Sequence, residues 1–158
     1  MLSQTNPDRA WIACHVPHQG RMCLLDHVES WDEQHIQCCA SSHRATDNPL
    51  RAYDRLGAAC GIEYAAQAMA VHGALLVPSD GPGVRIGYLV SMRSTMLHVP
   101  RLDDIAADLL VHAACVTRGG NNLLYQFRVS AAGRPLVEGR AAIVLNSGAL
   151  VPTVGRTP

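Results

Sequence analysis

The sequence contains no lysine, so arginine supplies all thirteen of its basic side chains. Schiff-base chemistry and the phosphate-binding P-loop both need a lysine amine, and the sequence therefore excludes them. Thirteen acidic residues cancel the arginines, and the formal net charge is zero. Without an excess of positive charge, neither nucleic acid nor an anionic membrane is expected as a partner.

Metal-ligand spacing and long apolar runs are missing too. The six cysteines form no C-x-x-C pair and the histidines are scattered, so no metal site is expected. No apolar run reaches the roughly 18 residues that span a bilayer, and no signal-peptide pattern opens the sequence. These observations predict a cytoplasmic protein whose cysteines are reduced and packed as small hydrophobic side chains.

Length and composition suit one folded domain. Of the 158 residues, 48% are hydrophobic and 16% are charged. A chain of this kind buries a sizeable core without disulfides or metal. We predict a single domain over residues 1–158, with its core at about 9–146 and a tail at each end.

One long helix is predicted over residues 55–73. Asp54 is the expected N-cap, and no proline interrupts the stretch. Small side chains let this helix lie close to a sheet that wraps it. They are Ala58, Ala59, Gly61, Ala65, Ala66, Ala68 and Ala70.

Six strands are predicted around the helix, two before it and four after it. Period-two alternation is clearest at 123–129, and turn-forming residues at 119–122 and 131–134 predict hairpins. The order of elements predicts an α+β fold, in which one curved antiparallel sheet wraps round a central helix. The expected strands are 23–30, 36–42, 87–99, 109–117, 123–129 and 136–145.

The candidates for chemistry are a histidine and a carboxylate. His43 follows the second predicted strand, and Glu63 lies inside the small-residue helix. A carboxylate among apolar neighbours either faces water or is held in its protonated form, in which it can act as an acid. The residues alone leave both interpretations open, along with purely structural roles.

Two segments resemble the 3-hydroxyacyl-[acyl carrier protein] dehydratases. The stretch 16–28 places the pair Pro17-His18 before an apolar strand, as in the N-terminal signature of that family. The helix segment 63–68 has the glutamate of the family motif at Glu63 and its glutamine at Gln67. The details resemble a divergent branch associated with aryl polyene and related polyketide-like gene clusters.

The resemblance implies a hot-dog fold that works as a dimer on acyl thioesters. It places His43 at the catalytic histidine and Glu63 at the catalytic carboxylate, contributed by different protomers. His43 would take a proton from C2 of the substrate, and Glu63 would protonate the departing C3 hydroxyl. Backbone amides of Gly57, Ala58 and Ala59 would bind the thioester carbonyl, which gains negative charge. Gln67 would orient Glu63, and His18 is expected to be structural or to lie beside the substrate.

The implied substrate is a 3-hydroxyacyl chain carried on the phosphopantetheine of an acyl carrier protein, with no further cofactor. Two alternatives stay open. A hot-dog thioesterase would use Glu63 to activate water and release a free acid. A non-catalytic subunit would pair with an active homologue, so the dimer is either a homodimer or a heterodimer.

Overall fold

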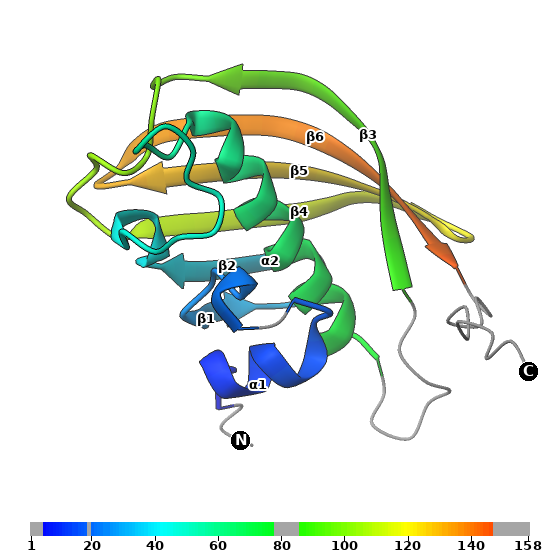
Figure 1. The fold of residues 1–158 in the computed structure, drawn as a ribbon. Coiled ribbons are helices and arrows are strands. Elements are labelled where there is room, and N and C mark those ends of the chain that lie inside the picture. Colours follow the sequence, from blue (N-terminus) through cyan, green and yellow to red (C-terminus); the bar gives the residue numbers. More distant parts are fainter. Residues whose placement is uncertain (1–4, 19, 78–85, 147–158) are drawn as a thin grey trace, which may run out of the picture.

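A six-stranded antiparallel sheet curves around one long helix in the computed structural model, which describes residues 5–18, 20–77 and 86–146 (Figure 1). The strand order is β1-β2-β4-β5-β6-β3, so β1 and β3 form the two edges. This architecture confirms the predicted α+β fold. The strands are β1 (His27–Trp31), β2 (His35–Ala40), β3 (Ile86–Leu97), β4 (Leu109–Gly119), β5 (Asn122–Ala131) and β6 (Arg134–Asn146).

The two predicted hairpins are present. In the β5–β6 turn, Ala132 and Gly133 both have positive φ, as a two-residue hairpin turn requires. In the β4–β5 turn, Gly119 pairs with Asn122, and Gly120 supplies the positive φ. The first predicted strand, at 23–30, begins too early in the sequence. Residues 23–26 precede β1, and only His27–Trp31 pair as a strand.

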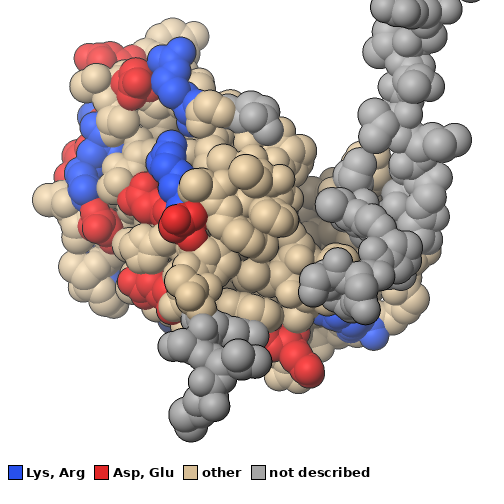
Figure 2. Space-filling view, turned by 90° about the horizontal axis from the view of Figure 1, so that it is seen from below, with Lys and Arg blue, Asp and Glu red and all other residues tan. Residues whose placement is uncertain are grey.

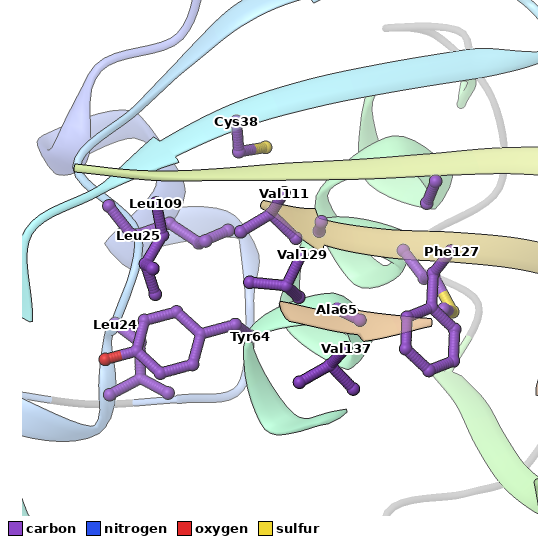
Figure 3. Close-up of a cluster of buried hydrophobic side chains, with 14 of the residues drawn as sticks. Leu24, Leu25, Cys38, Tyr64, Ala65, Leu109, Val111, Phe127, Val129 and Val137 are labelled. Atoms are coloured by element: carbon purple, nitrogen blue, oxygen red, sulfur yellow. The ribbon is translucent and has the colours of Figure 1, made fainter. Parts of the chain in front are cut away.

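The central helix α2 runs from Gly61 to Leu75 on the concave face of the sheet (Figure 1). Its buried side chains include Tyr64, Ala65 and Ala68. Figure 3 shows Tyr64 and Ala65 among side chains of the sheet and of the segment before β1. The approach is closest at Gly61, where an added Cβ would lie 2.9 Å from Cγ2 of Val137. Small residues therefore do bring this helix against the sheet.

The predicted N-terminus of the helix was wrong. Asp54 does not cap α2, and it lies in a loop with a φ of 60°. The segment after it is extended: the Leu56 carbonyl accepts from the Leu102 amide at 2.8 Å, and the Ala58 amide donates to the Pro100 carbonyl at 3.2 Å. A short 3₁₀ turn at Ala58–Cys60 then leads into α2. This pairing between distant segments displaces the start of the helix.

A short helix, α1 (Arg9–His15), was not predicted. The Asp8 carboxylate accepts the Trp11 amide at 2.9 Å and caps it, while Ile12 reaches the hydrophobic core. Because α1 is short, it gives little periodic signal in the sequence. Its end directs the chain toward Pro17 and His18.

All six cysteines are free, but they do not share one environment. Cys23, Cys38 and Cys39 are buried, as predicted, whereas Cys60 and Cys115 are half-buried and Cys14 is exposed. No helix in the described part of the chain is long and apolar enough to cross a membrane. Seen from below, charges of both signs are intermixed at one side, and the middle of this face is uncharged (Figure 2).

Candidate active site

Glu63, in the first turn of α2, contacts His18 of the same chain. Nε2 of His18 lies 2.9 Å from Oε1 of Glu63. The two side chains are 25% and 34% exposed, so both remain accessible to a ligand. The structure therefore pairs the predicted carboxylate with His18, which was expected to be structural or to lie beside the substrate.

Gln67 holds this pair in place. It lies one turn beyond Glu63, is fully buried, and its amide nitrogen donates to Oε1 of Glu63 at 3.4 Å. The same nitrogen donates to the Met22 carbonyl at 2.6 Å, and Oε1 of Gln67 accepts the Leu24 amide at 2.9 Å. Gln67 thus contacts Glu63 and also ties α2 to the segment that follows His18. Its role in orienting Glu63 for catalysis stays a prediction.

Only one of the two ring nitrogens of His18, Nε2, is placed to act on a ligand beside Glu63. The other nitrogen, Nδ1, is buried and has no hydrogen-bond partner among the described residues. Nε2 is the nitrogen that faces Glu63. Any proton transfer by His18 in this conformation therefore uses Nε2.

His43, the predicted base, lies in a different environment. It belongs to a 3₁₀ turn at Ser42–Arg44 and is fully buried. Because a backbone carbonyl can only accept, Nε2–H of His43 donates to the Ile105 carbonyl, at 3.0 Å. Burial lowers the pKa of this imidazole and favours its neutral form. In this conformation a substrate cannot touch the ring, and His43 is not the histidine that contacts Glu63 within the chain.

The turn that carries His43 is fixed by a buried polar network. The Ser42 hydroxyl donates to the Leu24 carbonyl at 2.8 Å, so the Tyr64 hydroxyl, 2.7 Å away, donates to Ser42. The Asn48 amide donates to Tyr64 at 3.1 Å and to the Ser42 carbonyl at 2.8 Å. With its hydrogen bonds satisfied in this way, the network holds the turn rigidly against α2.

The predicted oxyanion donors are only partly available. The Ala58 amide is already bonded to the Pro100 carbonyl, so it does not face a ligand in this conformation. Gly57 precedes the 3₁₀ turn and Ala59 lies within it. Their role in binding a thioester carbonyl stays a prediction.

A cavity of about 270 Å³ lies beside the turn that carries His43. Its lining includes Ser42 and Asn48, together with two arginines. Each arginine faces a carboxylate: Arg9 lies 3.4 Å from Asp26, and Arg21 lies 3.9 Å from Asp47. The cavity is therefore close to electrically neutral, and neither His18 nor Glu63 lines it.

Comparisons with known proteins agree with this architecture. Residues 11–149 match the ApeP-like family, described as ApeP dehydratase. The chain is similar in structure to the dehydratase heterocomplex ApeI:P from Xenorhabdus doucetiae. The TM-score is 0.74 and the identity 20%, over 86% of this chain and 91% of the other. No curated protein sequence matches the chain.

Thioesterases share the fold as well. A thioesterase mutant from Pseudomonas aeruginosa gives a TM-score of 0.63 at 13% identity, covering 92% of this chain and 98% of the other. A hypothetical thioesterase with coenzyme A from Streptococcus pneumoniae gives 0.57 at 13% identity, covering 76% and 84%. These likenesses confirm the predicted hot-dog fold.

Proposed function

Since the chain belongs to the ApeP dehydratase family, we propose that it removes water from 3-hydroxyacyl chains on an acyl carrier protein, with His18 and Glu63 as its catalytic pair. The observation that carries this proposal is the 2.9 Å contact between Nε2 of His18 and Oε1 of Glu63. The family membership agrees with the predicted dehydratase and its link to aryl polyene biosynthesis. We also propose that an acyl carrier protein delivers the substrate and that the reaction takes place in the cytoplasm.

The reaction needs one base and one acid, and the pair supplies both. Nε2 of His18 takes the proton from C2, and the electrons of the C2–H bond form the C2–C3 double bond. The C3–O bond breaks, and the departing hydroxyl takes a proton from the carboxyl group of Glu63 and leaves as water. A trans-2-enoyl thioester remains on the carrier. No cofactor is needed for these steps.

The direct contact between the two side chains explains how the pair is reset. After the reaction, His18 carries the extra proton and Glu63 lacks one. When the product leaves, the two groups return to hydrogen-bond distance, and the proton passes from Nε2 to Oε1. Gln67 keeps Glu63 within reach throughout, because its own hydrogen bonds fix it to the backbone at Met22 and Leu24.

His18 is preferred to His43 as the base because of access. A general base must come within hydrogen-bond reach of the proton that it removes. His18 is partly exposed beside Glu63, whereas His43 is fully buried and its Nε2–H is bonded to Ile105. His43 then has a structural role, as the anchor of its turn to the segment before β4.

The test is mass-spectrometric loss of water from a 3-hydroxyacyl-carrier protein. His18→Asn and Glu63→Gln are each expected to slow the reaction by roughly 10²–10⁴-fold, the usual contribution of an acid or base. His43→Gln is the comparison, with circular dichroism to establish that every variant is folded. A folded His43 variant that loses activity while His18→Asn retains it would return the role of base to His43.

The same assay separates the thioesterase alternative. A dehydratase leaves an enoyl chain attached to the carrier, whereas a thioesterase releases a free acid and a free thiol. The several thioesterases of this fold make that second measurement necessary. Appearance of free thiol without loss of water would overturn the dehydratase assignment for this chain.

We propose further that the chain pairs with a second, different hot-dog subunit through β3. The similar dehydratase from Xenorhabdus doucetiae is a heterocomplex. Among the described residues, β3 pairs with β6 on one side and with no strand on the other, and it carries most of the large exposed hydrophobic side chains. These are Tyr88, Leu89, Val90, Met96 and Leu97.

Co-expression with a candidate partner followed by size-exclusion chromatography tests this surface. Val90→Arg is expected to abolish the complex, since a charge would be buried in an apolar interface. Val116→Arg is the control, because Val116 is equally exposed, at 57%, but lies on β4. Loss of the complex in both variants, or in neither, would contradict an interface at β3.

A further inference from the structure

Three side chains of different chemical type converge at the β1 edge of the sheet: His27, Glu29 and Cys39. Each offers one ligand atom, and these atoms all lie within 4.8 Å of one another. His27 and Glu29 are on β1, and Cys39 is the cross-strand partner of His27 on β2. Because cross-strand partners project from the same face of a sheet, the pairing brings nitrogen and sulfur together.

The cluster lies on the face of the sheet away from α2. Val28 and Cys38, the neighbours of His27 and Cys39 along each strand, are fully buried in the core. Side chains alternate between the two faces of a strand, so His27 and Cys39 project to the other side. The cluster is thus separate from the pair formed by His18 and Glu63, which belongs to the helix side.

We propose that His27, Glu29 and Cys39 bind one zinc ion, with water completing a tetrahedral site. An imidazole nitrogen, a thiolate and a carboxylate are all ligands that zinc accepts, and three protein ligands with one open position form a common arrangement. A sulfur ligand disfavours magnesium and calcium, which take oxygen.

The geometry requires only a small adjustment. Zinc bonds of about 2.0–2.3 Å place tetrahedral ligand atoms roughly 3.3–3.6 Å apart. The three ligand atoms of the cluster lie within 4.8 Å of one another, so they need to move only slightly closer. The side chains of His27 and Glu29 are exposed, so they can rotate to bring their ligand atoms closer to the sulfur of the buried Cys39. The amide of Gln37 donates to Oε2 of Glu29 at 2.8 Å and orients that carboxylate, as outer-shell groups do in metal sites.

Two further carboxylates lie near Cys39, but each is paired with an arginine: Asp26 with Arg9 at 3.4 Å, and Asp108 with Arg44 at 2.7 Å. Glu29 is therefore the carboxylate that belongs to the proposed site. Cysteine binds zinc as the thiolate, so zinc binding at Cys39 releases the thiol proton.

The experiment titrates the metal-free, reduced protein with Co²⁺ as a spectroscopic substitute and then displaces it with Zn²⁺. The expected result is one equivalent of Co²⁺ and a thiolate-to-cobalt charge-transfer band. Cys39→Ser should abolish the band, whereas Cys14→Ser should leave it unchanged, since Cys14 is exposed and outside the cluster. His27→Ala should weaken binding by at least about tenfold, and Gln37→Ala by about 10–100-fold.

Three results would overturn the site: no charge-transfer band in the wild-type protein, a band that survives in Cys39→Ser, or a band that is lost in Cys14→Ser. His27→Ala and Glu29→Gln alter exposed side chains, so they test the site even if the buried Cys39 variant fails to fold. Binding is read out by absorption and is independent of dehydratase activity.

Discussion

Replacing His72 with leucine is expected to lower the free energy of unfolding by about 2–4 kcal/mol, because His72 joins the buried Tyr125 hydroxyl to the turn at Asp32. The imidazole is fully buried. Nε2–H donates to the Asp32 carbonyl at 2.8 Å, so Nδ1 accepts the Tyr125 hydroxyl at 2.7 Å. Leucine fills similar space but leaves the buried Tyr125 hydroxyl unpaired, at about 1–3 kcal/mol, and removes the hydrogen bond to the part-buried Asp32 carbonyl, at about 0.5–1.5 kcal/mol.

Urea unfolding followed by circular dichroism measures this loss, and thermal unfolding should show a fall in Tm of roughly 5–15 °C. Tyr125→Phe should cost about 1–2 kcal/mol, since it leaves Nδ1 of His72 without a donor and creates no cavity. Tyr88→Phe is the matched control: Tyr88 is half exposed, and its hydroxyl should contribute less than about 0.5 kcal/mol.

The double variant gives the decisive result. With both His72→Leu and Tyr125→Phe, neither a buried hydroxyl nor an imidazole nitrogen is left unpaired between the two positions. The double variant should therefore be more stable than the sum of the single effects predicts, by about 1–2 kcal/mol. Strict additivity would refute the claim that the two side chains stabilise the fold through each other.

Two further predictions concern the stability of the same fold. Burial holds the pKa of His72 and His43 below its usual value, so the unfolded chain binds more protons. The free energy of unfolding should therefore be highest above about pH 6.5, the usual pKa of histidine, and should decrease as the pH falls below it. Urea unfolding at several pH values measures this change. A urea midpoint that does not change with pH would contradict the prediction. Gly61→Ala should destabilise by about 1–3 kcal/mol through its clash with Val137, whereas Gly73→Ala, which meets no atom within 4 Å, should stabilise α2 by about 0.5–1 kcal/mol. Equal Tm values for the two glycine variants would refute the close approach at Gly61.

The parts of the fold that follow local rules could be predicted from the sequence. Period-two alternation and turn residues located β5 and its two hairpins, because each depends on neighbours a few positions away. The start of α2 could not be located in this way. Leu56 and Gly57 stay outside the helix because this segment pairs with residues 100–102, and no local pattern reveals a contact across that distance.

In the candidate site, too, contacts between near neighbours in the sequence were predictable and contacts between distant segments were not. Glu63 and Gln67 are four residues apart on one helix, and their spacing alone predicted that they interact. The contact between His18 and Glu63 joins segments far apart in the chain, and the only sequence signal for it was the Pro17-His18 pair before an apolar stretch. Likewise, His43 is buried against the carbonyl of Ile105, a backbone atom that carries no sequence signature.

The place of β3 in the sheet has a consequence for synthesis of the chain. Within the described part of the chain, β3 pairs only with β6: Leu97 pairs with Val137, and Ile86 with Asn146. This partner strand is synthesised well after β3. At ordinary translation rates, the time between synthesis of β3 and synthesis of β6 is roughly 2–12 seconds. During this time the apolar β3 segment remains unpaired. We expect β3 to be the last strand to join, and nascent chains halted before β6 to be the ones that chaperones capture.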